Sequence, residues 1–434
     1  MNAAPDWVVV LYAGSVAFTT YFCMYAFRKP FTAAKFDGLS FLGTQINLKT
    51  ALVISQIIGY ALSKYIGIRL LPEVSRRRRA VALLGFVGLA HGALLLFAVL
   101  PSEWKVLAIF LNGLPLGMIW GLVVWFLEGR RTSELLLAAL SCSFILASGV
   151  VKDVGRWLMS SYSVSEDWMP FTTGLIFLPV YLISVLLLNQ LPDPGPRDVA
   201  ERSPRAVMDR TARRAFLTST LPFMTMLLAA YFVVTAYRDY RDNYGVEILA
   251  GLGLENAAAI FTRIELPVAL GVMAVLAMLF LIRDNRRALG TALAMMILGA
   301  ALLTVASLLH NAGLVGPMGW MILLGLGSYL VYVPYGSILF DRLMASTRMA
   351  GTAVFAIYIA DAIGYTGSVV VQLYKDLFAG QESRLEFFRS FTYLTSIVAV
   401  VLLTGGLVYI MRFTARPAPA GLSTAHAGTA KESS

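Results

Sequence analysis

Residues 21–28 read YFCMYAFR, and a close copy, YFVVTAYR, returns at residues 231–238. Each copy has Tyr-Phe, three variable residues, Ala, an aromatic residue and then Arg, at the end of a strongly apolar run. The repeat indicates a chain built from two related halves. Because Arg28 and Arg238 occupy matching points of two apolar helices, the repeat predicts two cationic arms that meet at a pseudo-twofold axis and hold an anion.

Composition places the chain in a membrane. Hydrophobic residues make up 58% of the 434 residues and charged residues 14%, and the mean hydropathy is +0.73. A water-soluble protein of this length carries far more polar surface. Lys and Arg outnumber Asp and Glu by 35 to 25, but they sit in short loops between apolar runs, which argues against nucleic-acid binding. Cys23 and Cys142 lie inside apolar runs, so we expect neither a disulfide framework nor a metal site.

Twelve apolar runs are long enough to cross about 30 Å of hydrocarbon. The first follows the acidic Asp6 and has no cleavage site behind it, so we expect a retained first helix rather than a signal peptide. The pattern predicts an all-α polytopic membrane protein with twelve transmembrane helices and both ends on one side. The runs are 7–36, 46–67, 79–100, 104–127, 134–158, 168–190, 214–242, 254–282, 287–309, 315–341, 350–374 and 386–412.

Loop charges orient these runs. Arginines crowd the loops after the even-numbered runs, as at residues 76–79, so the positive-inside rule places those loops and both termini in the cytoplasm. A linker rich in Pro and charge, residues 191–213, separates a six-helix half at 1–190 from a second half at 214–414. The small, polar tail at 415–434 should be disordered. We therefore expect a multi-pass protein of a cell membrane, the bacterial inner membrane in particular.

Two longer stretches carry a resemblance to a known family. Residues 25–36, YAFRKPFTAAKF, precede SQIIGYALSKYIGIR at 55–69, and YVPYGSILFDRLMASTRMAGTAVFAIYIADAIGYTGS spans 332–368. These stretches resemble the organophosphate:phosphate antiporters of the major facilitator superfamily, which include the glycerol-3-phosphate and hexose-phosphate transporters. The resemblance implies the major facilitator fold, with two pseudo-symmetric six-helix halves.

The resemblance also implies roles for individual residues. Arg28 and Arg238 match the two arginines that hold the substrate phosphate in that family, and Lys29 and Lys64 match neighbouring family lysines. One departure is Phe144, which stands where the family has a fifth-helix histidine used in translocation.

The superfamily's loop motif after the second helix is also degenerate, since only Gly67 and the arginines at 76–79 remain. These departures indicate a remote branch whose substrate differs from a simple sugar phosphate.

The charged residues inside apolar runs are few. Each costs about 2.5–3.5 kcal/mol at a helix centre on insertion scales, so each should line a lumen or find a partner. Glu265 and Asp361 lie about halfway along their runs, with Arg263 near Glu265. For these three, a buried ion pair and a role in binding or proton coupling both stay open. Lys152 and Asp153, in the outer third of the fifth run, predict an outer vestibule or gate.

For Arg28 the alternative is an interfacial anchor that snorkels outward. The helix-compatible continuation after a kink at Pro30 favours a deeper position. The repeat at Arg238 favours it too. The predicted substrate-binding set is Arg28, Arg238, Lys29, Tyr25, Gln56, Tyr60 and Arg263. The predicted coupling or gating set is Glu265, Asp361, Lys152, Asp153, Glu128 and Asp341, of which the last two end the fourth and tenth runs.

The chain has no phosphate-binding loop for ATP and no His-Glu-x-x-His motif. We therefore expect neither an enzyme nor a cofactor. Two functions remain open. The first is a monomeric secondary transporter that moves a small organic anion, a phosphate ester or similar, across the lipid bilayer in exchange for phosphate or with protons. The second is a transporter-like receptor for such a solute. The tail resembles no signalling module, which favours transport.

Overall fold

The computed structural model describes residues 5–70, 75–127, 130, 132–192, 210–255, 257–347, 353–380 and 382–413. Within these ranges every regular element is a helix, and turns and loops join the helices; an isolated β-bridge pairs Ser40 with Asn47. This confirms the all-α prediction. The tail and residues 193–209 of the predicted linker lie outside the described residues. The helices are α1 (Asp6–Met24), η1 (Tyr25–Phe27), η2 (Pro30–Ala33), α2 (Leu48–Leu70), α3 (Arg76–Val99), α4 (Ser102–Leu127), α5 (Ser133–Tyr162), α6 (Met169–Asn189), α8 (Arg210–Asn243), α9 (Gly245–Gly251), α10 (Ile260–Phe280), α11 (Asn285–Asn311), α12 (Pro317–Ser337), α13 (Leu339–Thr347), α14 (Ala353–Leu377) and α15 (Arg384–Phe413).

Eleven of the described helices are long and apolar enough to cross a membrane. Each of them coincides with one of the predicted apolar runs. The remaining run, 46–67, overlaps α2. This helix has 23 residues, but it carries Lys49, Lys64 and Arg69 and is not among the eleven. The protein is therefore an all-α, multi-pass membrane protein.

The first predicted run, 7–36, is not one continuous helix. The α-helix ends at Met24, and the chain continues through the two 3-10 turns η1 and η2. Pro30 has no backbone N–H to donate and its ring crowds the preceding turn, which disfavours a regular α-helix just before it. The matching copy at 231–238 stays inside the single helix α8. The two copies of the repeat thus have different backbones.

The tenth predicted run, 315–341, is also divided. It contains α12 and the start of α13, which are separated at Ile338. The short helix α9, which follows α8 directly, had no counterpart among the predicted runs.

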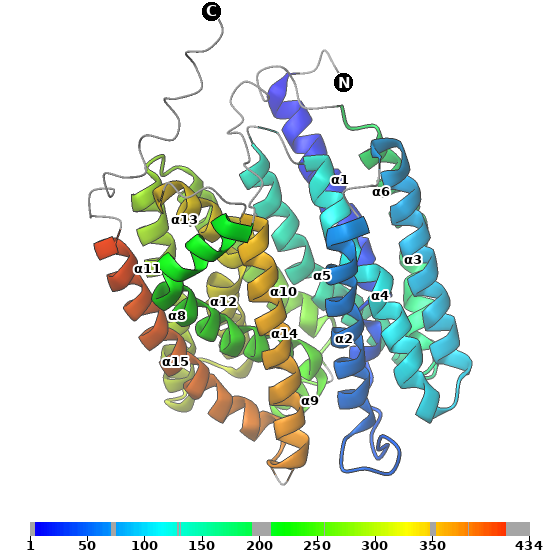
Figure 1. The fold of residues 1–434 in the computed structure, drawn as a ribbon. Helices are drawn as coiled ribbons and strands as arrows, with labels where there is room; N and C mark the ends of the chain where they lie inside the picture. Colours follow the sequence, from blue (N-terminus) through cyan, green and yellow to red (C-terminus); the bar gives the residue numbers. More distant parts are fainter. Residues whose placement is uncertain are drawn as a thin grey trace, which may run out of the picture.

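Helices α1 to α6 lie on one side of the molecule and most of α8 to α15 on the other (Figure 1). We call these the first and second helix groups. The most extensive contacts between them are made by α5 with α10 and by α2 with α14. The first turn of α1 and the last turn of α15 lie toward the same end, which is the upper end in Figure 1.

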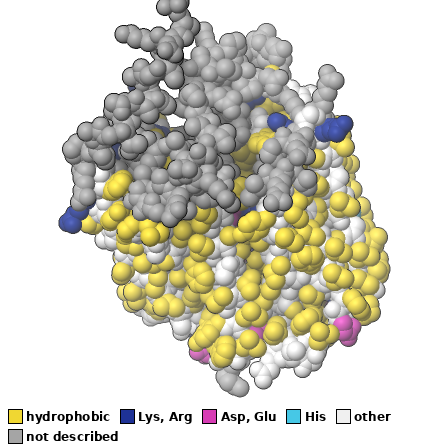
Figure 2. Space-filling model, viewed as in Figure 1, with side chains coloured by type: hydrophobic (Ala, Val, Ile, Leu, Met, Phe, Trp, Pro, Cys, Tyr) yellow, Lys and Arg dark blue, Asp and Glu magenta, His cyan; other side chains and the backbone are white. Residues whose placement is uncertain are grey.

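The sides of the molecule are apolar. Yellow hydrophobic side chains cover the visible flanks in Figure 2, and the Lys and Arg side chains in view lie at the upper end. Large apolar residues such as Leu298, Val401 and Ile397 are exposed on the long helices. Such a broad exposed apolar surface suits contact with lipid tails and not with water.

Glycines let α2 and α4 approach closely. A Cβ atom added to Gly113 would lie 2.6 Å from the carbonyl oxygen of Gln56, and one added to Gly117 would lie 2.5 Å from that of Tyr60. Real Cβ atoms are not found this close to backbone, so the helices would have to separate. The backbones of α2 and α4 therefore lie close together at these two glycines.

We expect Gly113→Ala to lower the thermal unfolding midpoint of the purified protein by several degrees, because overpacking costs about 1–3 kcal/mol. Gly88→Ala on α3 is the matched control, since nothing lies within 4 Å of a Cβ atom there. The control should unfold at or slightly above the wild-type temperature because Ala favours a helix over Gly. Equal midpoints for the two variants would contradict the close contact.

Candidate functional site

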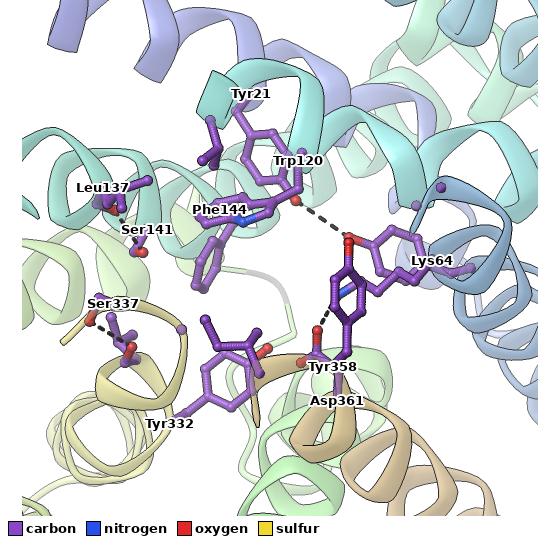
Figure 3. Close-up of a pocket in the computed structure, with 18 of the residues that line it drawn as sticks. Tyr21, Lys64, Trp120, Leu137, Ser141, Phe144, Tyr332, Ser337, Tyr358 and Asp361 are labelled. Atoms are coloured by element: carbon purple, nitrogen blue, oxygen red, sulfur yellow. Dashed lines mark hydrogen bonds and ion pairs between the residues drawn. The ribbon is translucent and has the colours of Figure 1, made fainter. Parts of the chain in front are cut away.

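A cavity of about 310 Å³ lies between the two helix groups. Side chains from both groups line it, and Figure 3 shows Tyr21, Trp120 and Phe144 facing it from one side and Tyr332 from the other. The lining continues to Gly67, at the last turns of α2. The cavity therefore extends from the middle of the molecule toward the end where α1 begins and α15 ends.

Arg28 lies at the inner part of this cavity, in the segment between η1 and η2. Its guanidinium carbon is 4.0 Å from the ring centre of Tyr60, and one of its terminal nitrogens donates to the Tyr25 hydroxyl at 3.4 Å. The side-chain amide of Gln56 donates to the backbone oxygen of Arg28 at 2.8 Å. Arg28 makes no ion pair with a described residue, and its Nε atom is buried without a hydrogen-bond partner.

Arg238 lines the same cavity from α8. Its guanidinium carbon is 3.9 Å from the ring centre of Tyr332, so both arginines lie against tyrosine faces. Unlike Arg28, Arg238 pairs with a carboxylate, that of Asp239, which also accepts a hydrogen bond of 2.5 Å from Ser368. The charge of Arg238 is therefore compensated by Asp239, whereas no carboxylate of the described residues pairs with Arg28.

An ion pair between two helices lies on the cavity wall, toward the last turns of α2. Lys64 of α2 contacts the carboxylate of Asp361 of α14, which also accepts a hydrogen bond of 3.2 Å from the Tyr231 hydroxyl. Lys64 lies 5.4 Å from the ring centre of Tyr60 and 5.3 Å from that of Tyr365. Figure 3 shows Lys64 and Asp361 meeting next to Tyr358.

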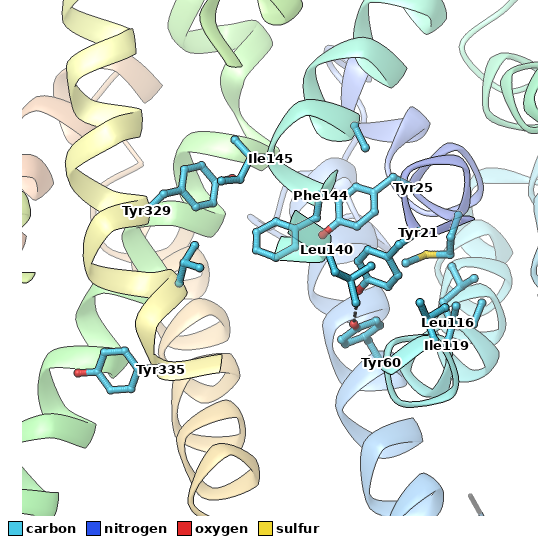
Figure 4. Packing of buried hydrophobic residues seen from close by; sticks show 14 of the residues in the cluster. Tyr21, Tyr25, Tyr60, Leu116, Ile119, Leu140, Phe144, Ile145, Tyr329 and Tyr335 are labelled. Carbon is cyan, nitrogen blue, oxygen red and sulfur yellow. Dashed lines mark hydrogen bonds between the residues drawn. The ribbon is translucent and has the colours of Figure 1, made fainter. Parts of the chain in front are cut away.

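Phe144 stands at the junction of the two helix groups. Its ring centre lies 6.4 Å from that of Tyr25 and 6.3 Å from that of Trp120 in the first group. On the other side it lies 6.2 Å from Tyr329 and 6.3 Å from Tyr332 of α12. Figure 4 shows Phe144 between Tyr329 and Tyr25.

Beyond the arginines, a network of buried ion pairs joins the two helix groups. One oxygen of Asp242 is 2.6 Å from Nζ of Lys29, and the other is 2.5 Å from Nζ of Lys152. The Ser148 hydroxyl also donates to Asp242, and Lys29 donates to Asn243 at 2.7 Å. Both lysines are buried. Because every donor comes from the first group and every acceptor from α8, this cluster holds the groups together at the end opposite the cavity opening.

Further contacts lie in the same region. Lys49 of α2 pairs with Glu247 of α9 at 2.6 Å. Asp153 of α5 accepts hydrogen bonds from the backbone and side chain of Thr262 at 2.7 and 2.6 Å, and so caps the first turn of α10. Lys152 and Asp153, predicted to form a vestibule or gate, thus both join α5 to the second group.

The predicted neighbours Glu265 and Arg263 lie on different faces of α10. Glu265 is buried and pairs with Arg241 of α8 at 2.7 Å, whereas Arg263 is exposed. Residues two apart on a helix do not face each other, so Arg263 cannot take the place of Arg241. Neither Glu265 nor Arg263 is among the described cavity-lining residues.

The structure brings together only part of the predicted set. Arg28, Arg238, Tyr25, Tyr60, Asp361 and Asp341 line the cavity. Gln56 and Lys29 face other partners, as described above. Glu128 lies outside the described residues.

Sequence reasoning missed three charged residues, Asp239, Arg241 and Asp242. The sequence feature that could have indicated them is the run of charged residues that begins at Arg238, inside an otherwise apolar stretch of α8.

A comparison with curated proteins found no match. A protein-family model matches residues 30–413. This range contains Arg238, Asp242 and Asp361, and it contains in full every helix that lines the cavity except α1 and η1. Since this match covers most of the chain, the protein belongs to the family of unknown function DUF5690.

Proposed function

We propose that this protein is a secondary transporter that moves a small organic anion across the membrane by alternating access. The observation that carries the proposal is the meeting of Arg28 and Arg238 in one cavity. These residues occupy matching positions of the sequence repeat, and they come from different helix groups. An anion held by both would contact both groups at once, which is what a rocking mechanism requires of its substrate.

The electrostatics of the cavity favour a negatively charged ligand. Lys64 and Asp361 compensate each other, and Asp239 compensates Arg238, whereas Arg28 has no carboxylate partner among the described residues. The Nε atoms of both arginines are buried without partners. A buried N–H group without an acceptor costs free energy, and an oxyanion would supply the acceptor.

The proposed architecture is the major facilitator fold. In it α2 is the twelfth span, the six-helix halves at 1–190 and 214–414 rock about the cavity, and the linker at 191–213 and both termini are cytoplasmic. The arginine-rich loops support this orientation in a bacterial inner membrane. The cavity would then open to the cytoplasm, and the Asp242 cluster would close the outer side.

Uptake into proteoliposomes tests the proposal. We expect vesicles loaded with phosphate to accumulate a labelled organic phosphate by exchange, with no need for a pH gradient. Accumulation that instead follows a pH gradient, and that Asp361→Asn abolishes while exchange persists, would assign proton symport, since Asp361 is the central carboxylate of the cavity wall. Binding without accumulation under either gradient would contradict transport and favour the transporter-like receptor.

A further inference from the structure

Aromatic rings make up a large part of the cavity walls. Trp120 contacts Tyr21 edge to face, with ring centres 4.9 Å apart, on the side of the first helix group. Tyr231 and Tyr332 stack at 5.4 Å on the side of the second group. Phe144 lies between these walls, as described above, so ring faces and edges surround the space next to the two arginines (Figure 3).

Several polar groups of the same walls are already engaged. The Ser141 and Ser337 hydroxyls each donate to a carbonyl oxygen of their own helix at 2.9 Å. Tyr231 donates to Asp361, and the Tyr21 hydroxyl lies 3.5 Å from that of Tyr60. These particular hydroxyls thus offer few free hydrogen-bond partners to a ligand.

Amide side chains, which commonly bind sugar hydroxyls in forked geometry, are turned elsewhere. Among the described residues that line the cavity there is no Asn, Gln or His. Two buried amides of the first helix group bond to the backbone, Gln56 to the Arg28 carbonyl and Asn112 to that of Phe27, each at 2.8 Å. A polyhydroxylated ligand would replace only part of its bonds to water here, and each unmatched hydroxyl would weaken binding.

From these walls we infer that the transported anion has a flat, apolar body, such as an aromatic ring, in place of a polyhydroxylated one. This inference rests on the proposed function and narrows its substrate class. The anionic group lies at Arg28 and Arg238, and the ring packs between the Trp120 and Tyr332 sides against Phe144. Offset and edge-to-face packing against these rings supplies the affinity that hydrogen bonds supply to a sugar.

The test uses two matched pairs of ligands that differ only in the body attached to the anionic group. Isothermal titration calorimetry of the purified full-length protein compares phenyl phosphate with glycerol 3-phosphate, and benzoate with glycerate. We expect the aromatic member of at least one pair to bind about tenfold more tightly or better, as ring packing in a preformed cavity predicts.

Phe144→Leu should reduce the preference for the aromatic ligand severalfold without weakening the binding of the glycerol-based ligand. Phe391→Leu is the matched control, because Phe391 is equally buried but packs in a separate cluster outside the cavity. Phe391→Leu should leave the binding affinities for both ligands of a pair unchanged.

The two proposals fail in different ways. If the glycerol-based member binds as tightly as its aromatic partner in both pairs, and Arg28→Lys weakens that binding, the aromatic inference is overturned while the proposed function stands. If none of the four anions binds at millimolar concentration, both the inference and the proposed function are overturned.

Discussion

Arg28→Lys is expected to weaken binding of the transported anion by about ten- to a hundredfold, because a charge-assisted hydrogen bond contributes about 1.5–3 kcal/mol. Lysine keeps the positive charge but not the planar fork that binds two oxygens of one anion. Arg238→Lys should also weaken binding of the anion. Since Arg238 also pairs with Asp239, part of its role is internal, and we expect the smaller loss there.

The double variant separates a shared site from two independent ones. If both arginines hold one anion, the losses should be non-additive. Arg263→Lys is the matched control, because Arg263 is exposed on α10 and does not line the cavity. Its affinity, measured by calorimetry with the best anion of the set above, should equal that of the wild type. Wild-type affinity in both cavity variants as well would mean that the arginines do not bind the substrate.

Asp242→Asn is expected to lower the stability of the folded protein by about 3–5 kcal/mol, which is typical when one partner of a buried ion pair is removed. Asparagine has nearly the same shape, so the change isolates the charge. It would leave Lys29 and Lys152 buried near each other without a carboxylate between them. The thermal midpoint in detergent, and uptake into proteoliposomes, should both fall.

A second substitution in the same cluster provides the rescue. Lys152→Met in the Asp242→Asn background removes one of the two stranded charges and should recover part of the lost midpoint. Asp37→Asn, at an exposed loop position, is the matched control and should have no effect. If Asp242→Asn unfolds at the same temperature as Asp37→Asn, the cluster does not hold the two helix groups together.

The general architecture could be predicted because its cause is local. A run of about twenty apolar residues forms a helix in lipid whatever its neighbours are, so a helix lies in each predicted run. The convergence of Arg28 and Arg238 followed from the same physics. A guanidinium deep in an apolar run must turn away from lipid, and the repeat placed both residues at matching depths.

The partners of the buried charges could not be predicted, because they depend on distant segments. Nothing near Lys29 in the sequence indicates that Asp242 neutralises it. Glu265 had a nearby arginine in sequence, yet it pairs with Arg241 of another helix. The sequence predicted the break after Met24 only in part, since Pro30 indicated a kink but not two successive 3-10 turns.

The charges of α2 have a consequence for how the protein is assembled during synthesis. On insertion scales a lysine at a helix centre opposes entry into the bilayer by about 2.5–3.5 kcal/mol, and α2 carries Lys64 well inside its length. The carboxylate that neutralises Lys64 belongs to α14, which leaves the ribosome only after most of the chain has been made. Until then α2 depends on its glycine-mediated contact with α4. In the proposed architecture with α2 as the twelfth span, stable integration of α2 is therefore a late, cooperative event, completed when the second helix group arrives.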